Sequence, residues 1–188
     1  KRNSGYNYRL SYSSGYRKPS IKELYYNWDT HPGGVAIYGN PDLKPAKNNY
    51  ISFSLDKRTD INDFSVDFYR NDIKDMISTQ MIGGSLHYQN YDEVAIDGLN
   101  IHYYRKITDK LKLKFVYNLT DAISDSQEIL EGISKHALRA NLDYAILDKA
   151  RIITSIKYSG KKTMFNQLDG SIKDLSAYWL SDIYMVTT

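Results

Sequence analysis

The chain of 188 residues contains no cysteine. This excludes a disulfide framework and any metal site built on thiolates, and it leaves the redox compartment undetermined. The chain also contains no run of 18 apolar residues, so no transmembrane helix is expected. Its net charge of +3 is too small to indicate nucleic-acid binding by itself.

Proline is scarce, and all four prolines lie between residues 16 and 50. Because proline lacks an N–H group and fixes φ, it does not fit inside a central strand. The sequence on both sides of this stretch alternates as strands do. We therefore expect residues 16–48 to form a long, folded loop between two strands.

Neither end of the chain resembles a natural terminus. No signal peptide is recognisable at the start, and the last residues lie within a strand-like pattern. We expect an internal piece of a longer protein.

Tyrosine is unusually frequent, with 18 residues against 5 phenylalanines. Tyrosine favours strands and surfaces where one end of the ring contacts water. This composition fits an outer-membrane barrel with its aromatic girdles. It also fits a soluble Tyr/Trp-rich carbohydrate-binding β-domain.

Apolar and polar residues alternate with a period of two along most of the chain, as in LKLKFVYNLT at residues 111–120. A soluble sandwich would alternate in the same way, but its strands are usually about 5–6 residues long. The segments here run to about 9–13 residues, and a tilted bilayer crossing needs about 9–11. The expected strands are 5–15, 49–58, 62–79, 91–107, 111–121, 135–146, 150–160 and 175–186. Gly98 is expected to mark a bulge or bend, and the pattern does not decide which face of 175–186 is apolar.

Short and long connections alternate along the chain. Short turns are expected at 57–62, 108–110 and 147–149, and long connections at 16–48, 80–91, 121–135 and 160–175. Tight turns on one side and long loops on the other are typical of outer-membrane barrels. The sequence therefore predicts an all-β, antiparallel, up-and-down transmembrane β-barrel segment of about eight strands.

Two proline-containing boxes resemble a known family. They are Tyr16-Arg17-Lys18-Pro19 and, after a loop, the six residues 40–45, which read NPDLKP. This order resembles the barrel of TonB-dependent outer-membrane receptors, although Ala46 stands where the family usually has glutamate. Two further stretches, YDEVAIDGLNIHYYRKI and GISKHALRANLDY, resemble later strands of the same family.

The resemblance implies that residues 1–188 are a partial barrel domain, one part of a 22-stranded barrel filled by a plug. It further implies a Gram-negative outer-membrane receptor that contacts membrane lipid and, through missing N-terminal parts, the TonB complex. Its ligand would be a scarce small molecule, most simply an iron compound such as a siderophore or haem. Cobalamin and glycan importers of the same family, a passive porin and an adhesin remain alternatives. No cofactor and no nucleic-acid partner are expected.

The ligand-binding residues are expected in the loop between the two boxes. Aromatic rings offer a large contact area at low entropic cost, and long loops on rigid scaffolds often carry binding residues. In the resembling family, haem receptors carry a histidine in this loop, and imidazole is a natural haem ligand. The candidates are Tyr25, Tyr26, Trp28, His31 and Tyr38, although these rings could instead pack the loop on itself.

The remaining polar residues suggest no chemistry. His87, His102 and His136 lack the spacing of metal ligands. The aspartates at 56, 60, 63, 67, 72 and 75 are expected to be solvated or to face a lumen. We expect no catalytic site, no metal site and no enzyme.

Overall fold

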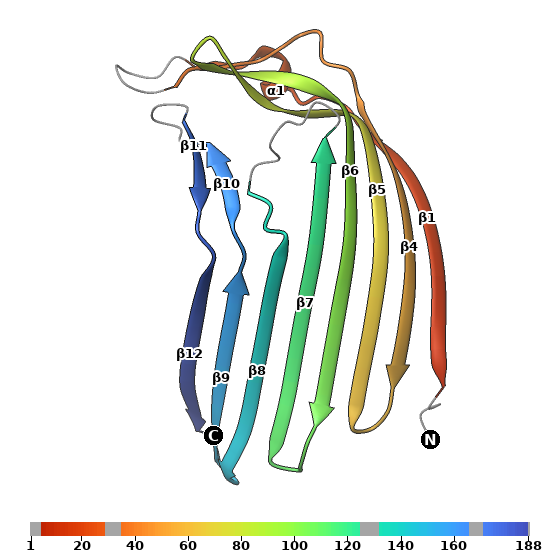
Figure 1. Cartoon of the computed structure of the whole chain (residues 1–188), viewed down its shortest axis with the longest axis vertical. Helices are drawn as coiled ribbons and strands as arrows, with labels where there is room; N and C mark the ends of the chain where they lie inside the picture. The colour runs from red at the N-terminus through yellow and green to blue at the C-terminus, as the bar shows by residue number, and fades with distance from the viewer. Residues whose placement is uncertain (1–4, 29–34, 125–131, 166–170, 188) are drawn as a thin grey trace.

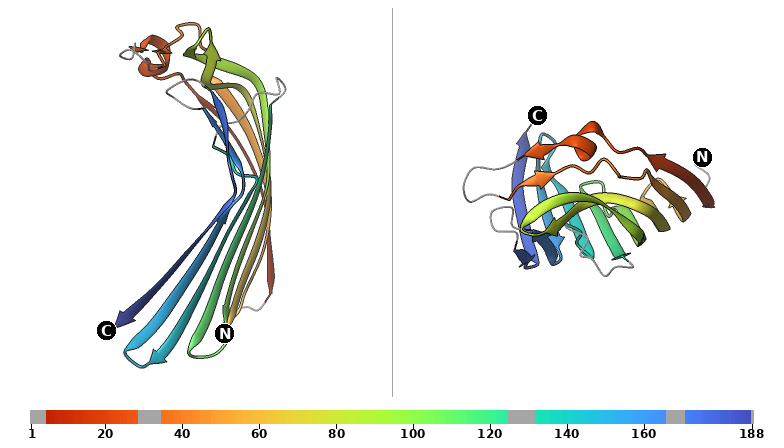
Figure 2. Two further views of the ribbon diagram at one scale, coloured as in Figure 1. Left: turned by 60° about the vertical axis from the view of Figure 1, so that its left-hand side comes forward. Right: turned by 90° about the horizontal axis from the view of Figure 1, so that it is seen from above.

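The structure, a computed structural model, describes residues 5–28, 35–124, 132–165 and 171–187. Its main sheet places eight long strands side by side, each antiparallel to its neighbours, in the order β1-β4-β5-β6-β7-β8-β9-β12. Figure 1 shows these strands as one continuous wall, and Figure 2 shows that the wall curves into an open arc. The strands are β1 (Tyr6–Arg17), β4 (Ala46–Arg58), β5 (Asn62–Ile82), β6 (Ser85–Lys106), β7 (Leu111–Ser124), β8 (His136–Leu147), β9 (Ala150–Ser159) and β12 (Tyr178–Thr187).

The smaller elements lie at one end of this wall, opposite the short turns (Figure 1). The segment between β1 and β4 contributes a helix and two short strands, and the segment between β9 and β12 contributes a separate hairpin. They are α1 (Ile21–Tyr25), β2 (Asn27–Trp28), β3 (Ile37–Tyr38), β10 (Lys162–Phe165) and β11 (Ile172–Leu175).

The eight predicted strands and their antiparallel order are confirmed, and the arc is a part of a barrel that eight strands leave open. The prediction of a long connection at 80–91 is wrong. β5 and β6 continue through it and meet at a two-residue turn of Gly83 and Gly84. Both glycines have positive φ, 59° and 85°, which is the conformation that a tight hairpin turn needs. This segment therefore forms the joined ends of two long paired strands.

The bulge expected at Gly98 is also wrong. Gly98 pairs in regular register with Tyr69 on β5 and with Thr120 on β7. A Cβ atom on Gly98 would stand 1.9 Å from Cζ of Tyr69. The glycine is therefore the place where the tyrosine ring lies across the next strand.

The register divides the side chains of the wall into an apolar face and a polar face. Residues directly opposite each other on paired strands share a face. One such row runs from Tyr8 through Leu55, Val66, Ile101, Tyr117, Leu138 and Tyr158 to Trp179. Many large side chains of this face are exposed, including Leu10 at 73% and Ile183 at 74%. So much exposed apolar surface on one face indicates a face that contacts something other than water.

The apolar face is the convex one. In the view from above, α1 lies on the side that the arc encloses (Figure 2). Arg17, which shares the polar face of β1 with Arg9, reaches Glu23 of α1 with an N–O distance of 2.9 Å. The polar face therefore lines the concave side, and the apolar face points outward.

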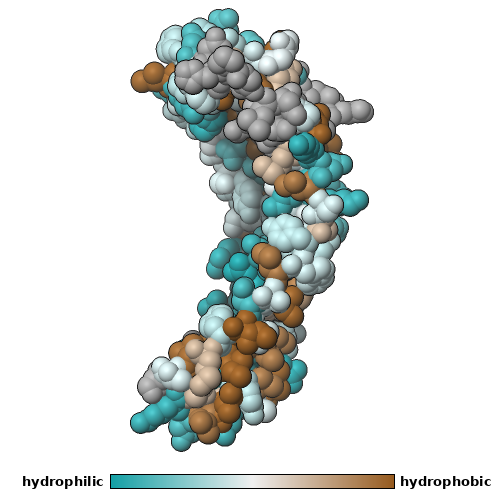
Figure 3. Space-filling model, turned by 90° about the vertical axis from the view of Figure 1, so that its left-hand side faces the viewer, coloured by the Kyte–Doolittle hydropathy of each residue, from teal (hydrophilic) through white to brown (hydrophobic). Residues whose placement is uncertain are grey.

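The outward apolar surface has the depth of a membrane. On β7, the five outward residues from Leu111 to Leu119 are all apolar or aromatic, and the next one is Asp121. Eight steps of about 3.3 Å, on a strand tilted by about 40°, span a depth of roughly 20 Å, close to the apolar band of an outer-membrane barrel. Figure 3 shows hydrophobic atoms gathered toward the short-turn end, with hydrophilic atoms dominating the middle.

The register also assigns the last strand, which the sequence pattern leaves open. Trp179 pairs with Tyr158, Ile183 with Thr154 and Met185 with Ile152, so these three side chains point outward. Ser181 lies on the same face, whereas the even-numbered side chains of β12, Asp182 among them, face the polar side. Among the described residues, no helix is long and apolar enough to cross a membrane.

Candidate ligand-binding mouth

Two segments bend over the concave side at the end of the wall opposite the short turns. The mouth loop comprises residues 18–28 and 35–45, and the hairpin extension comprises residues 75–92 at the joined ends of β5 and β6. Figures 1 and 2 show both segments bending over the concave side. Asp75, with φ of 53°, lies where the extension begins, and it is the one described residue other than glycine with positive φ.

The first box anchors α1 to the end of β1. Ser20 caps the helix, and the Glu23 carboxylate accepts hydrogen bonds from the Ser20 N–H at 2.7 Å and from the Ser20 hydroxyl at 2.9 Å. Arg17 donates to both oxygens of the same carboxylate at 2.9 Å. A carboxylate with this many donors is held in one position, and so is the helix that carries it.

Glu23 is an acid with a shifted pKa. Partial burial acts to raise the pKa of its carboxyl group, but the hydrogen bonds from Ser20 and the charge of Arg17 outweigh burial and lower it. Glu23 is therefore ionised at neutral pH, and the anchor with Arg17 is formed.

The return of the loop packs tightly against α1. Gly39 donates its N–H to the carbonyl of Tyr26, and Asn40 donates its N–H to the carbonyl of Glu23. A Cβ atom on Gly39 would lie 2.7 Å from the backbone of Leu24 and Tyr25. Only glycine fits at this close approach of two backbone segments.

The second box is clamped by the hairpin extension. The Asn90 side chain accepts the Lys44 N–H at 2.8 Å, donates to the Lys44 carbonyl at 3.0 Å and donates to the Asp75 carbonyl at 2.8 Å. Beside this clamp, Leu43 packs with Ile77 in a small buried cluster that also includes Ala46, with Leu24 and Tyr88 against it. The two boxes are therefore architectural, because they hold the mouth loop on the extension.

A second contact joins the loop to the extension. β3 pairs in parallel with β6, with Ile37 opposite Leu86 and Tyr38 opposite His87. The Leu86 N–H donates to the Ala36 carbonyl at 2.8 Å. The rings of Tyr38 and His87 lie with centroids 5.1 Å apart. The sequence pattern predicts a loop around His87 and therefore does not point to it as a residue of the mouth.

The expected binding residues occupy different environments. Tyr25 and Trp28 are exposed, at 65% and 50%, and are free to contact a ligand. Tyr26 and Tyr38 are half-buried: the Lys22 ammonium lies 5.1 Å from the ring centre of Tyr26, and Tyr38 packs on His87. His31 lies outside the described residues. The structure thus brings Trp28 and Tyr38 onto one small ribbon, β2 paired with β3, and leaves Tyr25 on the helix.

The concave wall below the mouth is polar. A hollow of about 330 Å³ lies against it, bordered by Arg9, Asp56, Asp63, Asp67 and Lys114 among others. These aspartates face the lumen, as expected, whereas Asp72 lies on the outward face with Arg70, 2.9 Å from its side chain. No group of three or more potential metal ligands occurs within the described part of the chain.

Comparison with known proteins decides the family. Residues 3–187 match the family model described as "TonB dependent receptor-like, beta-barrel". The chain belongs to the TonB-dependent receptor family. The iron-regulated outer membrane virulence protein of Vibrio cholerae serotype O1 is 28% identical over 168 residues, which cover 80% of this chain and 26% of that protein. The heme/hemopexin utilization protein C of Haemophilus influenzae is 27% identical over 177 residues, covering 80% of this chain and 25% of that one.

The fold comparison agrees with this assignment. The crystal structure of a variant ferric enterobactin receptor from Pseudomonas aeruginosa, in complex with enterobactin, superposes with a TM-score of 0.78. It is 16% identical in sequence, and the match covers 99% of this chain and 31% of that one. At this identity the likeness concerns the fold alone.

Membership of the family has direct consequences. TonB-dependent receptors are outer-membrane proteins of Gram-negative bacteria, and they are transporters rather than enzymes. The outward apolar face of the arc is therefore a lipid-contacting face, and the soluble carbohydrate-binding domain is excluded. The chain spans about a quarter of the length of the curated relatives that it matches.

Proposed function

We propose that the complete receptor imports an iron compound, a ferric siderophore or haem, across the outer membrane. The V. cholerae relative is named iron-regulated and the H. influenzae relative is named for heme utilization, which supports iron as the element carried. The observation that supports this proposal most directly is the structure of the mouth. Two sequence-distant segments are clamped together over the concave side and present exposed aromatic side chains there.

The remaining parts of the receptor lie outside this chain. In the proposal, residues 1–188 form one portion of a 22-stranded barrel, and an N-terminal plug fills its lumen and contacts the TonB complex. The polar concave wall supports this arrangement, because a lumen that passes a polar ligand must itself be polar. Energy then comes from the inner membrane through TonB.

The ligand is proposed to contact Tyr25, Trp28 and Tyr38 first. Tyrosine and tryptophan combine a large apolar area with a polar tip, which suits aromatic iron chelates and the porphyrin plane alike. Tyr26 and His31 complete the proposed surface. His31 is further proposed to ligate iron if the cargo is haem, since imidazole is a common axial ligand.

Growth under iron limitation tests the transport function. A strain lacking the complete gene should fail to grow on one iron source among several siderophores and haem, and the intact gene should restore growth only when TonB is present. Unimpaired growth on every iron source, or restored growth without TonB, would overturn the proposal.

Substitution in the mouth tests the contact residues. In the full receptor, Tyr25→Ala with Trp28→Ala should weaken binding of that iron source about tenfold or more, the usual effect of removing two aromatic anchors. Ile107→Ala, at an exposed residue of a turn at the opposite end, is the control and should bind normally. His31→Ala should reduce binding only if the cargo is haem; equal haem binding would remove His31 from the site.

A further inference from the structure

The outward face carries a group of hydrogen-bond donors where its apolar band ends. The outer-rim donors are Lys135, His136, Tyr158 and Trp179, on or beside β8, β9 and β12. Tyr158 and Trp179 belong to one register row with Tyr117 and Leu138, and His136 lies opposite Leu119, one row further toward the mouth. On β7, the next outward residue after Leu119 is Asp121, so the apolar band ends at this level.

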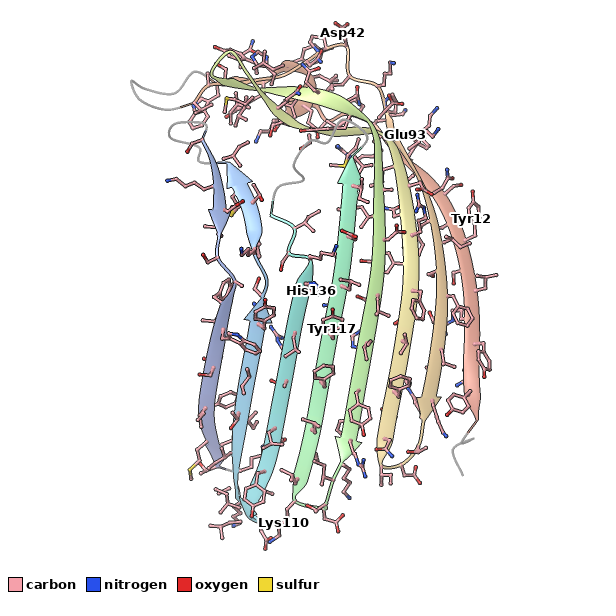
Figure 4. The ribbon with its side chains drawn as sticks, in the orientation of Figure 1. Tyr12, Asp42, Glu93, Lys110, Tyr117 and His136 are labelled. Atoms are coloured by element: carbon pink, nitrogen blue, oxygen red, sulfur yellow. The ribbon has the colours of Figure 1, made fainter. Side chains whose placement is uncertain are left out.

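His136 is held in place rather than being a free surface side chain. The Tyr117 hydroxyl lies 2.8 Å from Nδ1 of His136, and the two rings stack with centroids 6.2 Å apart. Figure 4 shows the two side chains side by side on neighbouring strands. When the hydroxyl donates to Nδ1, the imidazole proton resides on Nε2. In this tautomer, the Nε2–H of His136 has no hydrogen-bond acceptor among the described residues.

The neighbours of His136 also offer donors rather than acceptors. Asp121, the nearby carboxylate, is already paired with the Lys135 ammonium at 3.0 Å. The Trp179 ring packs on Tyr158 at 4.7 Å and is 63% exposed, and its indole N–H is a donor only. The Lys135 ammonium has three N–H donors and gives one of them to Asp121, so its remaining donors and the Nε2–H of His136 together favour an anionic oxygen ligand.

The position of this surface selects the ligand. The outer-rim donors continue directly from the lipid-contacting face, so the group that meets them in the membrane is a lipid headgroup. We infer that Lys135 and His136, with the rings of Tyr158 and Trp179 beside them, bind the phosphate of an outer-leaflet lipid. Tyr117 positions the imidazole for this contact. The site is independent of the iron compound, so it stands or falls separately from the transport function.

Binding of purified lipids to the complete receptor in detergent micelles tests the inference. Diphosphoryl lipid A should bind more tightly than the same lipid without its phosphates, and His136→Ala should weaken the diphosphoryl form about tenfold, the effect of one charge-assisted hydrogen bond. His136→Gln keeps an N–H donor and should retain most of the affinity, which also separates lost contact from lost folding. His102→Ala, on the concave face, should bind like the wild type.

Three outcomes would overturn the inference. Equal binding of the dephosphorylated lipid would show that the surface contacts lipid through its apolar side chains and not through the phosphate. Unchanged lipid binding in His136→Ala would show that the imidazole does not contact the phosphate. If inorganic phosphate also binds the wild type, and His136→Ala weakens phosphate binding as much as lipid binding, the site binds free anions and not a lipid.

Discussion

The ring of Tyr69 lies across the backbone of Gly98 on the neighbouring strand, where a Cβ atom would stand 1.9 Å from Cζ of the ring. The pair lies on the concave face, and Tyr69 also stacks on Tyr50 with ring centroids 6.0 Å apart. An aromatic ring over a cross-strand glycine covers backbone that would otherwise lack packing.

Gly98→Ala should therefore destabilise the barrel, because the methyl group and the ring of Tyr69 cannot occupy the same space. We expect a loss of about 1–3 kcal/mol, the usual cost of overpacking. Unfolding of the complete receptor in denaturant measures it. In the Tyr69→Ala background, where the ring is absent, adding Gly98→Ala should cost little further stability. Additive losses would show that the ring does not meet the glycine.

The anchor between Arg17 and Glu23 should depend on pH. The pKa of Glu23 is lower in the folded loop than its ordinary value of 4.5, so the carboxylate stabilises the loop above pH 4.5. That contribution is lost as the pH falls through the lowered folded pKa. Hydrogen exchange of the mouth loop should accelerate over this acidic range.

Glu23→Gln tests the same anchor at neutral pH. It should loosen the loop by about 1–2 kcal/mol through the loss of the charge paired with Arg17, because glutamine can still accept the Ser20 N–H and complete the capping box. The variant should also lose the acidic transition. An acidic transition of the same size in Glu23→Gln would assign it to another group.

Gly39→Ala should displace the return of the mouth loop from α1. Its methyl group would press on the backbone of Leu24 and Tyr25, which is not a flexible side chain that can move away. We expect faster protease cleavage in the loop and weaker binding of the iron source. Gly5→Ala is the matched control, because nothing lies within 4 Å of its Cβ position, and it should behave like the wild type.

Asn90→Ala should release the second box from the hairpin extension. The substitution removes three hydrogen bonds to backbone groups of Lys44 and Asp75, at a cost of about 1–3 kcal/mol. Hydrogen exchange at residues 40–45 should rise while exchange in β7 stays unchanged. Asn100→Ala, on the concave face of β6, is the control. An unchanged box in Asn90→Ala would contradict the clamp.

The wall could be predicted from the sequence because its determinant is local. Alternation such as Leu111, Leu113 and Phe115 on one face requires only a period of two, and it located all eight strands. The sequence does not show which side chains of β12 point outward, because apolar residues occur at both its odd and its even positions. Only the register with Tyr158 and its neighbours on β9 resolves it.

The mouth was harder to predict because it is built from contacts distant in sequence. The two boxes are recognisable in the sequence, but the pattern predicts a loop for the extension that clamps them, because glycine, glutamine and asparagine interrupt its apolar alternation. A glycine pair, Gly83 and Gly84, between strand-forming residues was the available signal for a hairpin. The contact of Tyr38 with His87 follows from the parallel pairing of β3 with β6, which no local pattern encodes.

The central claim is that the convex face contacts lipid and the concave face lines a wet lumen. Because residues 1–188 contain no cysteine, single cysteines introduced at positions 113 to 118 of β7 can be labelled with a fluorophore, in the complete receptor reconstituted with brominated lipids. The account predicts strong lipid quenching at 113, 115 and 117, and weak quenching with access to water-soluble quenchers at 114, 116 and 118. Quenching by lipid at both sets, or at neither, would contradict it.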